Sequence, residues 1–179
     1  TGRGMGAGDD DVLTAACVVE LTHLASLYHD DVMDEAELRR GAASANARWD
    51  NHVAILTGDF LFSKSSELTA ELGADAVRIQ AQTFTRLVEG QILETLGPID
   101  GADPLAHYLR VVAGKTGSLI ATSALYGARF SGASLEVEEA LRDYGEKVGV
   151  AFQLADDILD IASDSAESGK TPGTDLREG

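Results

Sequence analysis

Two pentapeptides with the pattern D-D-x-x-D are the residues of this chain best suited to chemistry. They read DDVMD at residues 30–34 and DDILD at residues 156–160. Each lies in the C-terminal part of a segment with helical apolar spacing, and residues i and i+4 of a helix share one face. Each motif should therefore point two carboxylates the same way, with a third beside them. The resulting candidates for metal ligands are Asp30, Asp31, Asp34, Asp156, Asp157 and Asp160.

The alternative interpretation is an acidic helix face exposed to solvent. Carboxylates one turn apart repel each other, and an aspartate near a helix C-terminus opposes the helix dipole. A bound cation would relieve both effects. Mg²⁺ is favoured because it prefers hard oxygen ligands and completes its octahedron with waters and substrate phosphates. The sequence lacks an EF-hand loop. Zinc is disfavoured because the candidate nitrogen and sulfur ligands show no suitable spacing; they are His23, His29, His52, His107 and Cys17.

Basic residues stand near both acidic motifs. Arg39 and Arg40 follow the first motif, and Lys170 follows the second. Lys115 and Thr116 are predicted to open a helix, whose free backbone N–H groups would favour an anion. Divalent metals flanked by Arg and Lys side chains form a clamp for a diphosphate. The pattern therefore predicts a diphosphate-binding site.

Length and composition restrict the class of protein. The chain has 179 residues, a net charge of −16 and 44% hydrophobic residues, which fits one ordered domain. Its acidity argues against a nucleic-acid partner. The single cysteine, Cys17, permits no internal disulfide, and the longest uncharged stretch, between Lys115 and Arg129, is too short to span a bilayer as a helix. We expect a cytoplasmic protein without a membrane span.

The elements that must position these residues are predicted to be helices, because Ala-, Leu- and Glu-rich segments alternate with Gly-containing breaks. Asp9, Asp10 and Asp11 should cap a first helix ending near Glu37, followed by a polar loop at Arg39–Ser44, and Ser134 should cap the last helix. The last helix is predicted to cover residues 135–161, and the helices between the first and the last cover residues 45–72, 75–96, 104–113 and 114–130. Residues 1–8 and 162–179 are expected to be flexible. The first helix is indicated by apolar positions that recur at roughly helical spacing: Val12, Ala16, Val19, Leu24 and Leu27.

Several segments together resemble the trans-polyprenyl diphosphate synthases of medium and long chain length, such as those making heptaprenyl or octaprenyl diphosphate. They are LASLYHDDVMDEAELRRG (24–41), GDFLF (58–62), EGQILE (89–94), GKTGSL (114–119), FQLADDILD (152–160) and GKTPGTDL (169–176). The resemblance implies an all-α, isoprenoid-synthase-type helical bundle with a central cavity, built as a homodimer. It also implies that an allylic prenyl diphosphate condenses with isopentenyl diphosphate after Mg²⁺-assisted ionisation.

The resemblance further implies a role for each matching residue. Asp30, Asp34 and Asp156 match the principal Mg²⁺ ligands, and the other three motif aspartates support them, partly through water. Positions that hold the allylic diphosphate are Arg39, Lys115, Thr116 and Lys170. Arg40 and Phe152 match positions facing the isopentenyl group, Gln153 one near the reacting ends, and Gln91 with Glu94 a supporting polar pair. The catalytic set is then Asp30, Asp34, Lys115, Gln153 and Asp156.

Small residues before the first motif carry a signal for product length. Ala25 and Ser26 lie five and four residues before Asp30, and Thr22 lies one turn lower. If the growing chain descends beside this helix, small side chains here leave room for a medium or long product. We therefore expect Ala25→Phe to shorten the product. The alternative is that Ala25 is simply small because two helices cross there.

Two departures from the family pattern are visible. A Gly-Lys-Arg segment is not found upstream of the first motif, and Ala43 stands where Pro often follows Arg-Arg-Gly. We expect residues 1–179 to form a single domain that lacks N- and C-terminal parts of the family's full length, with weak isopentenyl binding as a result. Two other functions stay open: a non-catalytic subunit of a partner synthase, and a class I cyclase. A long product could need release into a membrane.

Overall fold

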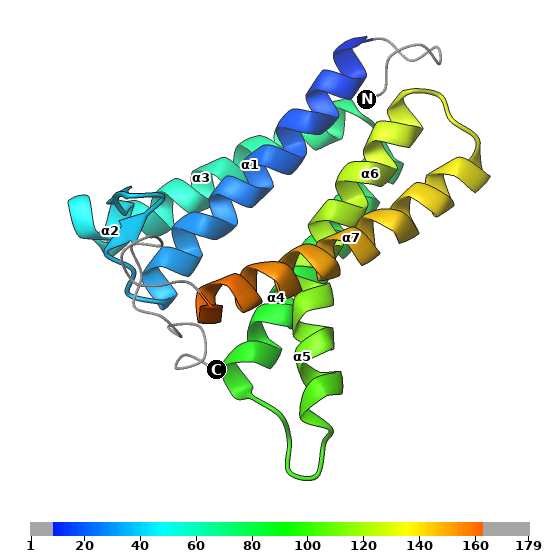
Figure 1. Cartoon of the computed structure of the whole chain (residues 1–179). Helices are drawn as coiled ribbons and strands as arrows, with labels where there is room; N and C mark the ends of the chain where they lie inside the picture. Colours follow the sequence, from blue (N-terminus) through cyan, green and yellow to red (C-terminus); the bar gives the residue numbers. More distant parts are fainter. Residues whose placement is uncertain (1–8, 163–179) are drawn as a thin grey trace.

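The computed structural model describes residues 9–162, and nearly all of its regular structure is helical, which confirms the all-α prediction (Figure 1). The helices are α1 (Asp9–Met33), α2 (Ala45–Arg48), α3 (Asn51–Glu71), α4 (Ala74–Leu96), α5 (Pro104–Val112), the π-helical turn η1 (Ala113–Gly117), α6 (Ser118–Phe130) and α7 (Leu135–Ala162). The short strands β1 (Leu38–Arg39) and β2 (Ala42–Ala43) form one hairpin. The predicted flexible ends at residues 1–8 and 163–179 lie outside the described residues.

The first predicted helix ends earlier than expected, at Met33 rather than near Glu37. The loop that follows contains the antiparallel hairpin, in which Arg39 pairs with Ala42. Arg40 and Gly41 form its turn with φ angles of 51° and 77°. A two-residue turn with both φ angles positive matches the twist of the flanking strands. The hairpin therefore gives the segment after the first aspartate motif a defined shape.

The helix predicted over residues 45–72 is interrupted. Trp49 ends α2, and Asp50 begins a new helix because its side chain accepts a hydrogen bond of 2.8 Å from the backbone N–H of Val53. An aspartate at this position satisfies one of the free N–H groups of a helix start. The sequence prediction did not recognise Asp50 as an N-cap, because it lies within an otherwise helical pattern.

The break predicted at Gly114 is absent, because α5 continues through η1 into α6. Gly114 instead permits close packing: a Cβ atom there would lie 2.9 Å from Cα of Gly90 in α4. A Cβ atom on Gly90 would in turn lie 2.7 Å from the backbone nitrogen of Lys115. The two glycines therefore let η1 pack directly on α4. Single-turn π-helical segments are frequent at functional sites.

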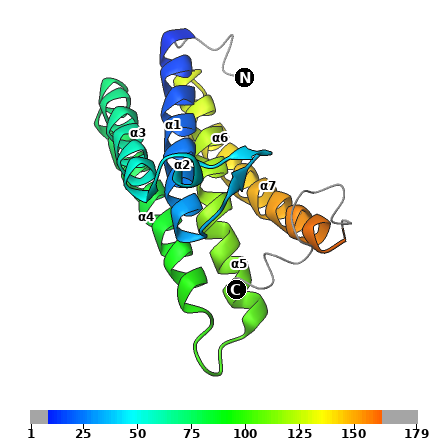
Figure 2. The same ribbon diagram turned by 90° about the vertical axis from the view of Figure 1, so that its left-hand side faces the viewer.

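Helix α1 packs along α3 and also against α6, while α6 pairs with α7 (Figures 1 and 2). The buried core cluster contains Ala15, Val18, Ala76 and Tyr126. Not every residue of the apolar pattern in α1 faces this core, because Ala16 is exposed. The helix is apolar almost all round, so neighbouring helices rather than its own pattern decide which side is buried.

Helix α1 is also the one helix in the described range that could cross a membrane by length and composition. Part of Asp10–Met33 has a mean hydropathy of 1.2. Core helices of proteins without a membrane span pass the same test, so this is weak evidence. The expectation of no membrane span stays a prediction.

Candidate functional site

The first aspartate motif begins in the last turn of α1 and ends at Asp34, directly after this helix, and its three carboxylates have different surroundings. Asp30 is partly buried and Asp34 is exposed. Asp31 is only 4% exposed and forms an ion pair with Arg39, whose Nε donates to Asp31 Oδ1 at 2.7 Å. This pair anchors the β1–β2 hairpin to α1. Asp31 therefore holds Arg39, and Asp30 and Asp34 remain as the carboxylates that could bind a cation.

Desolvation disfavours the ionised form of Asp30, and also that of Asp34 although much of its side chain is exposed. Desolvation raises the pKa of Asp30 from 3.8 to about 6, against the opposing effect of Lys115, and the charge of Asp34 adds to the increase. Desolvation also raises the pKa of Asp34, with Lys115 again opposing. Nearby positive charge favours the ionised carboxylates. A divalent cation between them would do the same more strongly.

Lys115 is held beside these aspartates by an ion pair with Glu94 of α4. The prediction that a helix begins at Lys115 and Thr116 with free backbone N–H groups was wrong, because η1 continues directly from α5. Any anion binding at Lys115 must come from its ammonium group. Arg40, at the tip of the hairpin, is exposed, and Lys170 lies outside the described residues.

The second aspartate motif lies near the end of α7. Asp156 is exposed, whereas Asp157 accepts hydrogen bonds from Tyr108 of α5 and, at 2.8 Å, from Nε2 of Gln153. The hydroxyl of Thr116 in turn donates to Oε1 of Gln153 at 2.8 Å. Phe152 is 62% exposed. The side chain of Asp160 lies outside the described part of the chain.

The turn η1 connects the two motifs. Lys115 acts on Asp30 and Asp34, and the next residue, Thr116, bonds to Gln153 beside the second motif. Within residues 9–162 no hydrogen bond or ion pair joins the two motifs directly. Sequence reasoning missed Tyr108. Its position two helical turns before Lys115 was the available signal.

A cavity of about 370 Å³ opens beside Asp30 between α1, α3 and α4. Its lining is mostly apolar and includes Ser26, Phe62, Phe84 and Leu96. The rings of Phe62 and Phe84 are 4.5 Å apart between centroids. An elongated apolar group with its polar end at Asp30 would fit this arrangement. Gln91 also lines the cavity, and its buried Oε1 has no partner among the described residues.

The three residues predicted to affect chain length occupy different positions. Ser26 lines the cavity, but Ala25 does not. Ala25 is fully buried where α1 approaches Gly58 of α3, whose Cβ would lie 3.2 Å from the Ala25 carbonyl oxygen. This position favours the helix-crossing interpretation of Ala25. Thr22 lies one turn below Ser26 and accepts a hydrogen bond of 2.5 Å from Gln80.

The donor set fits Mg²⁺ in the way that substrate-bound sites hold it. Within residues 9–162 no group of three or more His, Cys, Asp or Glu side chains could hold a metal ion alone. Mg²⁺ usually takes only one or two carboxylates and completes its coordination with phosphate oxygens and waters. Asp30 and Asp34 supply such a pair, and their mutual repulsion is what a cation would relieve.

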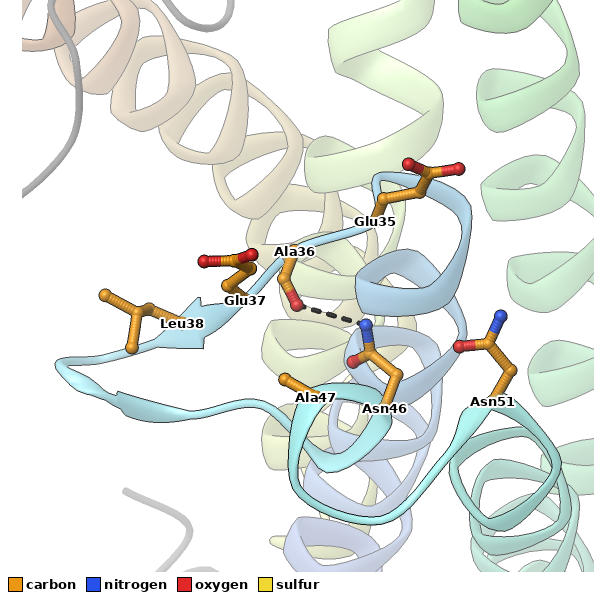
Figure 3. Close-up of a pocket in the computed structure, with 7 residues that line it drawn as sticks. All are labelled: Glu35, Ala36, Glu37, Leu38, Asn46, Ala47 and Asn51. Atoms are coloured by element: carbon orange, nitrogen blue, oxygen red, sulfur yellow. Dashed lines mark hydrogen bonds between the residues drawn. The ribbon is translucent and has the colours of Figure 1, made fainter.

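A second pocket, of about 540 Å³, lies between the hairpin and α2 (Figure 3). Asn46 projects into it and donates through Nδ2 to the carbonyl oxygens of Ala36, at 3.0 Å, and Asp31, at 3.1 Å. These two bonds tie α2 to the end of α1. The pocket therefore helps to fix the backbone of the first motif.

Comparison with known proteins gives consistent results. The sequence model named "Polyprenyl synthetase" matches residues 4–179. The chain is 58% identical over 168 residues to nonaprenyl diphosphate synthase of Mycobacterium tuberculosis (strain ATCC 25618 / H37Rv), covering 94% of this chain and 50% of that protein. It is 38% identical to octaprenyl diphosphate synthase of Haemophilus influenzae (strain ATCC 51907 / DSM 11121 / KW20 / Rd), covering 99% of this chain and 54% of that protein.

Solved structures agree. Geranylgeranyl pyrophosphate synthase from Corynebacterium glutamicum, complexed with calcium and isoprenyl diphosphate, matches with a TM-score of 0.81 and 54% identity, over 96% of this chain and 51% of that one. Polyprenyl synthase from Caulobacter crescentus CB15, in the same kind of complex, matches with a TM-score of 0.89 and 39% identity, over 99% and 54%. The chain thus spans about half the length of the relatives it matches. Its fold, its two aspartate motifs and these similarities together show that the chain belongs to the polyprenyl synthetase family.

Proposed function

We propose that this chain belongs to a prenyltransferase that condenses an allylic prenyl diphosphate with isopentenyl diphosphate, giving a trans-polyprenyl diphosphate of medium or long chain length. The described residues would form the part of the active site that ionises the allylic diphosphate. The single observation that supports this most is the placement of Asp30: it lies at the mouth of an apolar cavity, beside Asp34 and within the influence of Lys115. A diphosphate head at the aspartates and a prenyl tail in the cavity would use both features.

Asp30, Asp34 and Asp156 are proposed to hold Mg²⁺ when the allylic diphosphate binds. What bound Mg²⁺ supplies is stabilisation of the negative charge that develops on the leaving diphosphate. Lys115 adds a fixed positive charge, oriented by Glu94. Arg39, held by Asp31, would contact the same head group from the hairpin. These side chains would all favour heterolysis of the allylic C–O bond.

The cavity lining has a separate role. The carbocation left after ionisation reacts rapidly with water, so an apolar wall protects it until the alkene of isopentenyl diphosphate attacks. Phe62, Phe84 and Leu96 provide such a wall. The proton lost after the attack has no side-chain base in these motifs, and a diphosphate oxygen is the proposed acceptor.

The test is incubation of the protein with farnesyl diphosphate, labelled isopentenyl diphosphate and Mg²⁺, followed by sizing of the lipid product. Linear diphosphates that require Mg²⁺ would support the proposal, and condensation in excess chelator would contradict it. Cyclic hydrocarbons would favour the cyclase alternative. Product formed only after a partner synthase subunit is added would favour the subunit alternative.

A homodimer in the cytoplasm is the proposed assembly. Helix α3 exposes Val53, Leu56 and Phe60, and a second copy would cover such apolar side chains. Light scattering of the purified protein would check this, and a monomer at high concentration would contradict it.

A further inference from the structure

Tyr108 of α5 contacts the second aspartate motif, and the sequence of that motif did not predict this contact. Its hydroxyl donates to Oδ2 of Asp157, while Nε2 of Gln153 donates to Oδ1 of the same carboxylate at 2.8 Å. Gln153 also accepts a bond from Thr116. Both oxygens of Asp157 are thus occupied, and a network of four side chains links α5, η1 and α7.

We propose that Tyr108 is a positioning residue: by holding Asp157, it fixes this part of α7 so that the carboxylate of the neighbouring Asp156 stays exposed. Successive helical residues are offset by about 100°, so anchoring Asp157 sets the direction of Asp156. Asp156 is exposed in the structure. The inference rests on the proposed function, since it assigns a supporting residue to that site.

Among the described residues, few side-chain contacts hold the end of α7. Ile158 and Leu159 are each 63% exposed, so this turn buries little apolar surface. Among the described residues, the bond from Tyr108 is the only side-chain hydrogen bond between α5 and α7. Helix ends with few buried contacts open readily. The Tyr108 contact therefore restrains the part of the helix that carries the second motif.

The chemistry of the contact suits a permanent restraint. A hydrogen bond donated to an ionised carboxylate is stronger than one between neutral groups. The bond from Tyr108 would therefore hold the Asp157 carboxylate in one orientation.

The experiment compares Tyr108→Phe with Tyr144→Phe, a matched control on α7 whose tyrosine is 64% exposed. The first measurement is amide hydrogen exchange of residues 153–159 in the metal-free protein. Tyr108→Phe should raise exchange in this segment by about tenfold, and Tyr144→Phe should leave it unchanged. Since no turnover is involved, this result does not depend on the proposed function.

The second measurement is steady-state kinetics at varied Mg²⁺. Loss of a partner that orients metal-binding carboxylates typically costs 10–100-fold in metal affinity or activity. We expect Tyr108→Phe to need about tenfold more Mg²⁺ for half-maximal rate, with KM for farnesyl diphosphate little changed. The double variant Tyr108→Phe/Asp157→Asn should be no worse than Asp157→Asn alone, because both changes break one contact.

Unchanged exchange at residues 153–159 in Tyr108→Phe would overturn the inference. A fall in thermal stability with the Mg²⁺ requirement of the wild type would also overturn it, because it would indicate a purely structural role. If the wild type itself gave no condensation product, the proposed function would fail, and the exchange measurement would still decide whether Tyr108 restrains α7.

Discussion

Replacing Asp30 by Asn should stabilise the metal-free protein at neutral pH. Asp30 has a pKa of about 6 in the native state against an ordinary value of 3.8, so the native state binds its proton more tightly than the unfolded chain. As pH rises from about 4 to 6, this group makes the free energy of unfolding fall, and above 6 the loss is complete. A difference of about two pKa units corresponds to about 3 kcal/mol, and the partial exposure of Asp30 lowers the expected value to about 1–3 kcal/mol.

The measurement is urea unfolding of wild type and Asp30→Asn at pH 4.5, 6 and 7.5 with a chelator present. The variant should gain stability relative to wild type as pH rises through this range, because it carries no charge to desolvate. The neighbouring substitution Asp31→Asn is the control. It should destabilise by about 1–3 kcal/mol at pH 7.5, because it weakens the ion pair with Arg39. Equal behaviour of the two variants, or a less stable Asp30→Asn protein at pH 7.5, would refute the reasoning.

Asp30→Asn also tests the metal site without any measurement of turnover. A ligand at about 100 times its dissociation constant stabilises a protein by about 2.7 kcal/mol. Mg²⁺ together with inorganic diphosphate should therefore stabilise the wild type, and Asp30→Asn should lose most of that gain. Retention of the full gain in Asp30→Asn would show that Asp30 is not a ligand. The partly buried charge of Asp30 would then lower stability without contributing to metal binding.

Three other substitutions test the packing and the cavity. Gly90→Ala should lower stability by about 1–3 kcal/mol in urea unfolding, since its Cβ would lie 2.7 Å from the backbone nitrogen of Lys115; an unchanged midpoint would show that α4 and η1 can separate freely. Tyr126→Phe should lower the free energy of unfolding by about 1–3 kcal/mol, because the Tyr126 hydroxyl donates to the Ala76 carbonyl at 2.8 Å in the core. The same substitution at an exposed tyrosine should lower it by less than about 0.5 kcal/mol. Ser26→Phe should shorten the lipid product by filling the cavity below Asp30, and a product of wild-type length would exclude Ser26 from the path of the chain.

Much of the candidate site follows from local helix geometry and could be predicted from the sequence. The shared face of Asp30 and Asp34 depends only on the helical repeat, and so does the offset of Asp31. The basic residues after the first motif could also be read from the sequence. The side chains that they contact could not be predicted from it. Arg39 is held by Asp31 because a two-residue hairpin folds it back onto α1, and that turn was predicted only as a polar loop.

The prediction of a break at Gly114 was wrong. Gly114 was expected to end a helix, which is its common role between apolar segments. In the structure it remains helical, because the absence of a Cβ is used for contact with Gly90 instead of for a turn. The sequence does not distinguish these two uses, since the contact involves a residue on another helix.

The chain by itself determined its helical class, the acidic motifs and the offset between neighbouring carboxylates such as Asp30 and Asp31, because these depend on residues within one or two turns. Tertiary packing decided which face of α1 is buried, where the cavity opens and that Tyr108 meets Asp157. The physical reason is that an apolar helix offers several equivalent faces and a polar side chain several possible partners. Only the positions of the neighbouring helices select among them.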